Sequence, residues 1–152
     1  MRLAVQNRAG HPIVFEEALH TYFAISDISD IAISGLAGAT YIDKTDASRR
    51  ELQTAELVTI TAETDSVYLD TPGRCVIEDR GWRRGVVIEK DGGASTVVWN
   101  PWAGKAAAMA DLGDHAWRGM ACVEAGNSRQ RGAARSERRA PDVDVIFVDT
   151  KA

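Results

Sequence analysis

Short β-branched and aromatic runs separated by turn residues constrain the fold of this chain most. Such runs occupy residues 12–25, 31–36, 39–44, 56–64, 66–70, 74–79, 84–93, 95–102, 118–127 and 143–150. Turn signals stand between them at Pro72-Gly73, Asp91-Gly92-Gly93 and Gly113-Asp114. Regular spacing of this kind predicts an all-β protein built as an antiparallel sandwich. One alanine-rich segment, 105–112, is predicted to be helical and to stop before Gly113.

The composition is that of a globular protein. The chain has 152 residues, of which 45% are hydrophobic and 26% charged, enough for one domain with a core. It contains no run of about eighteen apolar residues, so no membrane span is predicted. Its N-terminus lacks the apolar run of a secretory signal, which predicts a cytoplasmic location. The net charge of −4 gives no reason to expect that the bulk of the chain binds nucleic acid.

The character of the sequence changes after Asn127. The segment SRQRGAARSERRAP (128–141) holds Arg129, Arg131, Arg135, Arg138 and Arg139. We therefore treat residues 1–127 as the sandwich and residues 128–152 as an atypical arginine-rich tail, within which PDVDVIFVD can form an edge strand. A shifted reading frame would produce such an abrupt change and is one hypothesis for the tail. Contact of the arginines with a polyanion is another.

Glu124 is the first candidate for chemistry. In GMACVEAGN, strand alternation places Met120, Cys122 and Glu124 on one face and the small or apolar residues between them on the other. A carboxylate in such surroundings loses hydration, which raises its pKa and makes it a competent base near neutral pH. The alternative is a glutamate at a strand end that pairs with an arginine.

His20 is the second candidate. It lies among apolar and aromatic residues in EEALHTYFAIS, where a histidine can be an acid–base group or a hydrogen-bonded core residue. His11 and His115 lie in predicted loops. No two histidines have metal-ligand spacing, and the distant Cys75 and Cys122 form no CxxC pair, so no metal site or disulfide scaffold is predicted.

Two further segments could bind a sugar. STVVWNPW ends a predicted strand with Trp99 and Asn100, and aromatic faces beside amides suit sugar rings and their hydroxyls. The alternative is a hydrophobic corner of the sandwich. Asp65, in ETDSVYL, is either the acceptor for a substrate hydroxyl or the first residue of an Asx turn.

Several long segments together resemble one family, the D-hexose-6-phosphate mutarotases (glucose-6-phosphate 1-epimerases) of the aldose 1-epimerase superfamily. The resemblance runs from about Leu3 to Asn127 and is carried by ALHTYFAISDI, SGLAGATYIDK, ETDSVYLDTP, CVIED and VVWNPWAGKAAAMADLGDHAWRGMACVEAGN. It implies a galactose-mutarotase-like β-supersandwich, of which this chain is the C-terminal half. It also implies interconversion of the α and β anomers of a hexose 6-phosphate such as glucose 6-phosphate.

The resemblance assigns roles to individual residues. The catalytic histidine of the family falls on His20 and its catalytic glutamate on Glu124. A sugar-binding aspartate falls on Asp65, and Trp99 and Asn100 are expected to border the pocket. The chemistry needs one acid and one base and no metal or cofactor.

The same resemblance leaves the activity of this chain open. The family's arginines around the substrate phosphate lie in an N-terminal half that this chain does not contain. We therefore expect exposed sheet edges that favour self-association or pairing with a separate N-terminal piece. A catalytically inert remnant or sugar-binding β-module is the alternative to an active anomerase.

Overall fold

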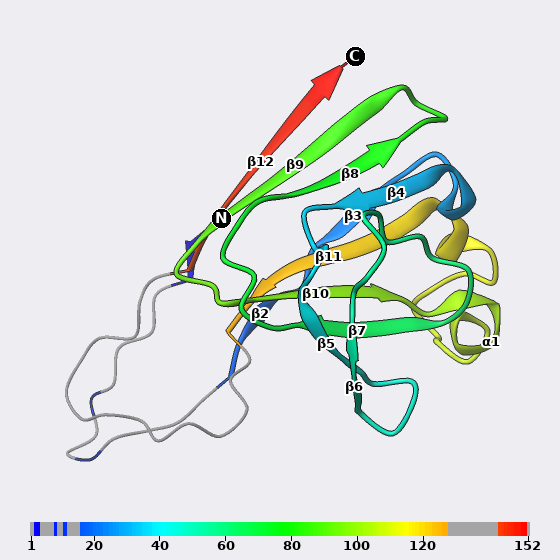
Figure 1. The fold of residues 1–152 in the computed structure, drawn as a ribbon. Helices are drawn as coiled ribbons and strands as arrows, with labels where there is room; N and C mark the ends of the chain where they lie inside the picture. Colours follow the sequence, from blue (N-terminus) through cyan, green and yellow to red (C-terminus); the bar gives the residue numbers. More distant parts are fainter. Residues whose placement is uncertain (1, 4–7, 9–10, 12–15, 128–142, 152) are drawn as a thin grey trace.

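The computed structural model describes residues 2–3, 8, 11, 16–127 and 143–151, which form two antiparallel β-sheets (Figure 1). The predicted all-β class is thus confirmed. Sheet A has the strand order β1-β12-β9-β8-β4. Its strands are β1 (Arg2–Leu3), β4 (Ile31–Ser34), β8 (Cys75–Asp79), β9 (Arg84–Asp91) and β12 (Val143–Lys151). β12 pairs with β9 from Asp144 to Lys151, and the short β1 lies on its other side.

Sheet B has the order β2-β11-β10-β7-β5-β6, and β3 also pairs with β11. Its strands are β2 (Ala18–Leu19), β3 (Tyr22–Ala24), β5 (Thr40–Asp43), β6 (Arg49–Leu52), β7 (Thr64–Tyr68), β10 (Ser95–Asn100) and β11 (Met120–Gly126). The run predicted at 12–25 is therefore two short strands against one partner, and residues 12–15 lie outside the described part. This sheet carries the candidate site.

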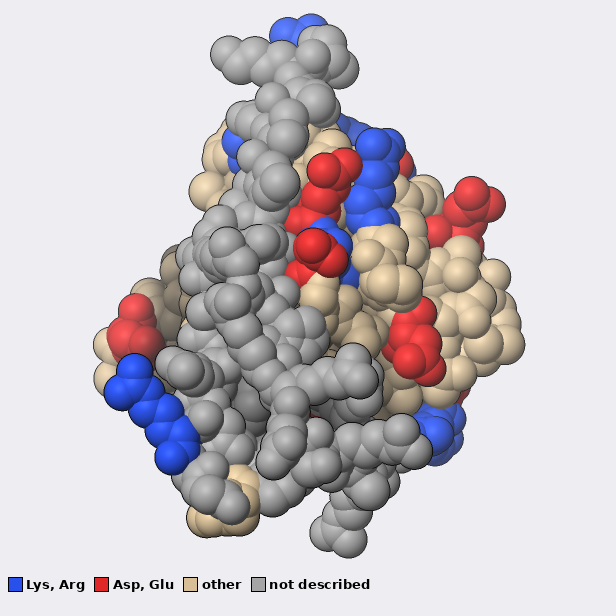
Figure 2. Space-filling model, turned by 90° about the vertical axis from the view of Figure 1, so that its left-hand side faces the viewer, with Lys and Arg blue, Asp and Glu red and all other residues tan. Residues whose placement is uncertain are grey.

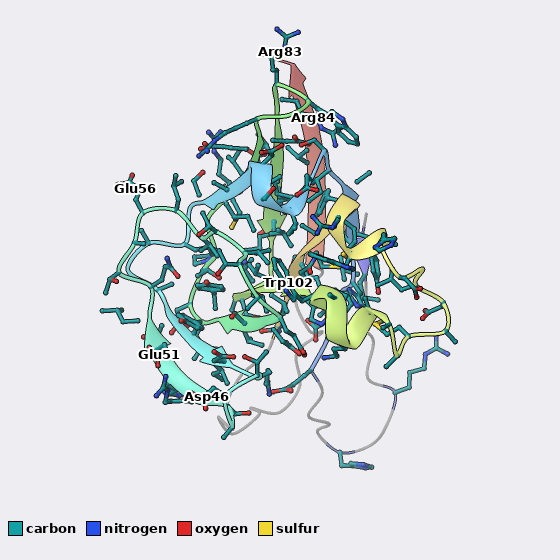
Figure 3. All side chains as sticks on the ribbon, turned by 90° about the vertical axis from the view of Figure 1, so that its right-hand side faces the viewer. Asp46, Glu51, Glu56, Arg83, Arg84 and Trp102 are labelled. Atoms are coloured by element: carbon teal, nitrogen blue, oxygen red, sulfur yellow. The ribbon has the colours of Figure 1, made fainter. Side chains whose placement is uncertain are left out.

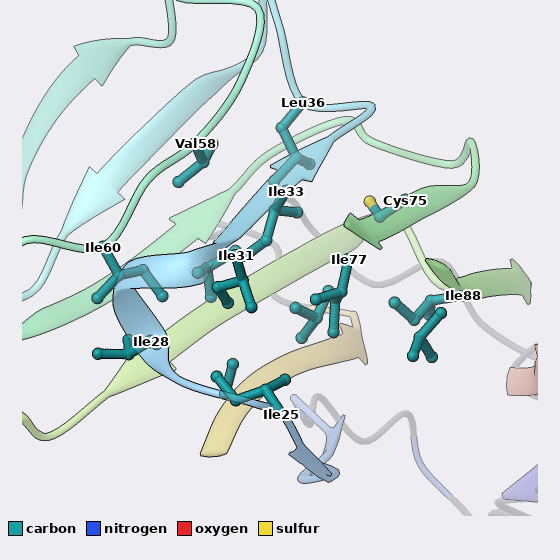
Figure 4. Close-up of a cluster of buried hydrophobic side chains, with 14 of the residues drawn as sticks. Ile25, Ile28, Ile31, Ile33, Leu36, Val58, Ile60, Cys75, Ile77 and Ile88 are labelled. Atoms are coloured by element: carbon teal, nitrogen blue, oxygen red, sulfur yellow. The ribbon is translucent and has the colours of Figure 1, made fainter. Parts of the chain in front are cut away.

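The main core lies between the two sheets (Figure 4). Sheet A contributes Ile33, Ile77 and Ile88, and sheet B contributes Val98 and Val123, each at most 2% exposed. Burial of one such side chain stabilises the fold by about 1.5–3 kcal/mol relative to leaving it in water. Because these residues alternate along their strands, the other face of sheet B points away from sheet A.

Residues 56–64 form less regular structure than predicted. Only Val58 makes a β-bridge, to Ile33 at the edge of sheet A, with N–O distances of 2.8 and 2.9 Å. Val58 and Ile60 still enter the core beside β4 (Figure 4). The run is apolar because it covers the end of the core, and strand pairing resumes only at Thr64.

Sequence analysis missed strand β6. Its turn from β5 has Ala47 and Ser48 at φ 47° and 58°, the left-handed conformation of a tight hairpin. Arg49 of β6 pairs with Asp46 at 3.1 Å and with Glu51 at 2.5 Å, the two acidic residues marked at this turn in Figure 3. Charged residues hide the strand pattern here because an edge strand tolerates them on its exposed sides.

The predicted helix 105–112 is also corrected. Helix α1 spans Trp102–Ala106, and residues 107–112 form turns. A 3₁₀ turn, η2 (Ala116–Gly119), leads into β11, and another, η1 (Ile28–Asp30), precedes β4. Proximity to β10 decides the start of α1, because the Asn100 Oδ1 accepts a hydrogen bond from the Trp102 N–H at 2.9 Å.

β3 is anchored to sheet A through the tip of the β8–β9 hairpin, where Figure 3 shows Arg83 and Arg84. Arg84 donates a hydrogen bond to the carbonyl of Ala24, the last residue of β3. The buried carboxylate of Asp79 accepts from the backbone N–H groups of Ser26 at 3.0 Å and of Trp82 at 3.1 Å. Burial opposes ionisation of Asp79, but these hydrogen bonds and the one from the Ser26 hydroxyl hold its pKa below the ordinary value.

Described residues on the side of the molecule drawn in Figure 2 carry charges of both signs. Figure 2 shows acidic and basic side chains interspersed on that side of the molecule rather than collected into one patch. Among the described residues, no helix is long and apolar enough to cross a membrane.

Candidate active site

One row of side chains crosses the outer face of sheet B, the face that points away from sheet A. The strand register pairs Tyr22 of β3 with Cys122 of β11, Cys122 with Trp99 of β10, and Trp99 with Asp65 of β7. Cross-strand partners share a face of the sheet, so these four residues form a continuous line over four strands. Two predicted site residues, Trp99 and Asp65, are thereby neighbours.

The two predicted catalytic residues lie in the adjacent row. Glu124 follows Cys122 by two positions in β11 and therefore points to the same face. Leu19 pairs with Ala125 and Tyr22 with Cys122, a continuous register that sets His20 opposite Glu124. The His20 Nδ1 and the Glu124 Oε1 are 2.7 Å apart.

The two side chains of the pair differ in their exposure to solvent. The His20 side chain is 49% exposed, whereas that of Glu124 is 6% exposed. Burial raises the pKa of Glu124, the negative charge of Asp65 raises it further, and His20 lowers it. A buried carboxylate hydrogen-bonded to an exposed imidazole has the geometry to exchange a proton with a ligand.

Aromatic rings fix the orientation of His20. Its ring stacks on Tyr22, with centroids 4.7 Å apart, and lies nearly perpendicular to the Trp99 ring, with centroids 5.5 Å apart. The Tyr22 hydroxyl lies 3.4 Å from the His20 Nε2. With Nδ1 directed at Glu124, Nε2 is the ring nitrogen left for another partner. Sequence analysis did not single out Tyr22, although it follows His20 by two positions in the same motif and so shares its face.

A small apolar cluster lies under the pair. It consists of Trp99, Met120 and Cys122, with Val97 and Met109 packed against it. Cys122 is fully buried, and burial, followed by the charge of Glu124, raises the pKa of its thiol strongly. The predicted alternation of Met120, Cys122 and Glu124 on one face of β11 is therefore confirmed, but all seven residues of the strand are buried.

Asp65 lies within β7 rather than in a turn ahead of a strand. It is partly exposed, and burial raises its pKa while the positive charges of Lys105 and Lys44 lower it. Lys105 is held at the same rim by an ion pair with Glu63 at 3.1 Å. Asp65 can therefore offer a carboxylate oxygen to a ligand on the face that holds His20 and Glu124.

Asn100 does not join this group, so its expected place at the pocket is corrected. It follows Trp99 by one position and points to the opposite side of β10, where it is fully buried. Its Nδ2 donates to the carbonyls of Trp117 at 2.8 Å and Met120 at 2.9 Å, and its Oδ1 accepts from Trp102. Both hydrogens of the Asn100 side-chain amide are therefore in hydrogen bonds. Through these contacts Asn100 links β10 to α1, at Trp102, and to η2, at Trp117. Trp102 is labelled in Figure 3.

A separate cavity of about 290 Å³ lies on the opposite side of β5 and β7. Its lining includes Tyr41, Asp43, Gln53 and Tyr68, and it contains none of the predicted site residues. The predicted site residues thus lie on the outer face of sheet B, away from this cavity.

The structure is thus a two-sheet antiparallel β-protein with a histidine–glutamate pair beside aromatic rings on one sheet. The aldose 1-epimerase family model matches residues 1–135. The chain belongs to the aldose 1-epimerase family, in agreement with the resemblance of its motifs.

Relatives within the family support this placement. The chain is 38% identical over 123 residues to a protein of Cenchrus ciliaris named "Putative glucose-6-phosphate 1-epimerase", and 34% identical over 107 residues to an Escherichia coli K12 protein of the same name. These matches cover 81% and 70% of this chain but only 37% and 36% of the relatives. The chain therefore spans a little over a third of the length of these relatives.

The fold matches a solved structure. The crystal structure of a "putative mutarotase" from Salmonella typhimurium superimposes with a TM-score of 0.81 at 27% identity, over 90% of this chain and 46% of that one. A second crystal structure, of a "Putative aldose 1-epimerase" from Escherichia coli K12, has a TM-score of 0.62 at 14% identity, which supports the fold alone. The two sheets thus correspond to about half of a mutarotase fold.

Proposed function

We propose that this chain interconverts the α and β anomers of a hexose 6-phosphate such as glucose 6-phosphate, with His20 and Glu124 as its acid–base pair. The observation that carries the proposal is the 2.7 Å contact between an exposed imidazole and a buried carboxylate on the outer face of sheet B. The sugar phosphate is suggested by the names of the relatives from Cenchrus ciliaris and Escherichia coli.

The reaction needs two proton transfers and no net change in protonation. Glu124 removes the proton from the O1 hydroxyl while protonated His20 gives a proton to the ring oxygen O5. The C1–O5 bond breaks and a carbonyl forms at C1. After rotation about the C1–C2 bond, O5 attacks the other face of the carbonyl, Glu124 returns its proton to O1, and His20 recovers its own. Each positioned transfer contributes roughly a hundredfold to ten-thousandfold to the rate.

The surroundings of the pair fit these roles. Since Nδ1 of His20 faces Glu124, Nε2 is the atom that delivers the proton to O5. Tyr22, which is 49% exposed and packs against Trp99, gives the sugar ring an apolar surface to lie against. Asp65 accepts a hydrogen bond from a sugar hydroxyl. The free, buried cysteines suit the reducing cytoplasm, which we propose as the location.

Magnetisation-exchange NMR on glucose 6-phosphate tests the proposal, because it measures α–β exchange directly. We expect the purified chain to accelerate exchange and Glu124→Gln to abolish the acceleration. Glu78→Gln is the matched control, since Glu78 is exposed on β8 of the other sheet. Exchange at the wild-type rate in Glu124→Gln would remove Glu124 as the base.

A non-catalytic sugar-binding module is the second candidate. The observation that favours it is the limited coverage of the relatives, since a site completed by the rest of their length would bind sugar weakly here without turning it over. Sugar binding with no accelerated exchange, in a chain shown to be folded by cooperative melting, would support this candidate and contradict the first.

A further inference from the structure

Three potential metal ligands of different chemistry converge on the outer face of sheet B. One ring nitrogen of His20, the sulfur of Cys122 and a carboxylate oxygen of Glu124 all lie within 4.8 Å of one another. Two of the three come from one face of β11, and the third lies directly across from them. Cys122 and Glu124 are placed by β11, and His20 lies in the two-residue connection between β2 and β3, both of which pair with β11.

The donor set selects the kind of cation. A thiolate, an imidazole and a carboxylate together suit Zn²⁺, which accepts sulfur, nitrogen and oxygen ligands and leaves a fourth position to water in open sites. Mg²⁺ and Ca²⁺ require oxygen-rich shells of at least six ligands, which this cluster does not supply. Metal–ligand bonds of about 2.0–2.3 Å imply donor separations below about 4 Å, so the ligands need to draw together by roughly 1 Å.

We propose that His20, Cys122 and Glu124 form a Zn²⁺-binding site and that Zn²⁺ bound there blocks the acid–base pair. Zn²⁺ replaces the proton between His20 and Glu124 and the proton of the Cys122 thiol, and both protons leave to water. The oxidation state of each group stays unchanged. With one histidine nitrogen and one glutamate oxygen bound to the ion, neither residue can pass a proton to a substrate.

The neighbouring residues support the ligands. The Tyr22 hydroxyl lies 3.4 Å from the His20 Nε2, so it can hold the second ring nitrogen while Nδ1 binds the ion. Trp99 and Met120 pack beside Cys122 and limit the access of water to the sulfur. Sequence analysis excluded a metal because it examined histidine pairs and CxxC spacing, whereas this site combines two residues of β11 with His20, which lies between β2 and β3.

Cobalt titration of the metal-free purified chain tests the binding, and it requires no catalytic activity. We expect Co²⁺ to produce a thiolate-to-cobalt charge-transfer band and the intense visible bands of a tetrahedral site, and Zn²⁺ to remove both by displacement. Cys122→Ala is expected to lose the charge-transfer band. Cys75→Ala is the matched control, since Cys75 is the other buried cysteine and lies in the core between the sheets, and it is expected to keep the band.

Two outcomes would overturn the proposal: no band in the wild-type chain, or an unchanged band in Cys122→Ala. If Cys122→Ala does not fold, His20→Asn decides, because it alters an exposed side chain and leaves the thiol in place. An unchanged cobalt spectrum in folded His20→Asn would then exclude the site.

The inhibitory part of the inference rests on the proposed function, and its failure can be distinguished from a failure of that function. Absence of α–β exchange in the metal-free chain contradicts the proposed function and leaves the cobalt result standing. In an active chain, we expect Zn²⁺ to suppress exchange in wild type and in Cys75→Ala, with recovery after a chelator is added. Unchanged exchange in a chain whose cobalt spectrum shows an occupied site would contradict inhibition.

Discussion

The two faces of sheet B are both buried along β11, yet they serve different purposes. Ala121, Val123 and Ala125 point into the core between the sheets, which is built of apolar side chains from both sheets. Cys122 and Glu124 point to the outer face, where a carboxylate with 6% exposure meets a half-exposed histidine. Burial alone therefore does not mark a residue as core. Whether a buried residue belongs to the core or to the candidate site depends on the chemistry of its neighbours.

The core between the sheets and the outer face of sheet B also differ in the partners of the ionisable group that each of them buries. On the inner side, the Lys90 Nζ donates to three uncharged oxygens of described residues: the Ser95 carbonyl at 2.8 Å and the Thr96 and Thr71 hydroxyls at 2.5 and 3.3 Å. Burial lowers the pKa of Lys90 to about 8. On the outer side, Glu124 faces an imidazole that can carry the opposite charge. The outer arrangement can exchange a proton with a ligand, whereas the inner one joins the two sheets.

The largest effect is expected at the outer face. His20→Asn removes the proposed acid but keeps an N–H donor for Glu124, so exchange of glucose 6-phosphate anomers should slow by roughly a hundredfold to ten-thousandfold. The free energy of unfolding should change by about 1 kcal/mol or less, the value of one hydrogen bond at an exposed side chain. Paired NMR exchange and urea unfolding measure the two quantities. Full activity in the variant would contradict the acid assignment.

Asn100 is expected to behave in the opposite way to His20, because its hydrogen bonds stabilise the fold and do not face the candidate site. Asn100→Ala leaves two carbonyls and one N–H without their partner, so we expect a loss of about 3 kcal/mol in urea unfolding. Gln53→Ala, which removes a more exposed amide that bonds to Ala55 and Tyr68, should cost about 1 kcal/mol. If Asn100→Ala kept wild-type stability but lost sugar binding, Asn100 would be a site residue and the structural role would be contradicted.

Val97 and Val98 allow a direct comparison of the two faces of sheet B, because they are neighbours on opposite faces of β10. Val98 is fully buried in the core between the sheets, whereas Val97 is partly exposed beside the outer cluster. Val98→Ala should destabilise the chain by about 2 kcal/mol through lost burial and a cavity, and Val97→Ala by about 1 kcal/mol or less. Equal losses in urea unfolding would show that both faces are packed as core.

The last prediction concerns pH and Lys90. Because its pKa is lowered from 10.5 to about 8 on folding, the unfolded chain binds more protons than the folded chain between these values. The penalty of burying the charged amine is thus fully present below about pH 8 and is relieved as the pH rises toward 10.5. Relative to Lys90→Met, wild type should gain stability with rising pH in urea unfolding. Lys44→Met, at an exposed lysine, serves as the control, and parallel curves for Lys90→Met and wild type would contradict the burial effect.

Local pattern predicted the strands wherever one or both faces of the strand are buried. The alternation in β11 was correct, as were most strands of the core. Pattern failed at β6, where edge exposure permits a run of charges, and at residues 56–64, where apolar residues cover the core without pairing as a strand. It also failed at α1, because the side chain of Asn100 on β10 sets where that helix begins.

Residue order alone determined the family, the all-β class and the roles proposed for His20, Glu124, Asp65 and Trp99, because these depend on motifs and on two-residue periodicity. Only the tertiary structure decided which of them meet. His20 and Glu124 are more than a hundred positions apart in the sequence, and the antiparallel register of β2, β3 and β11 brings them to 2.7 Å. The same register adds Cys122 and Tyr22 to the group, while the pleat of β10 turns Asn100 away from it.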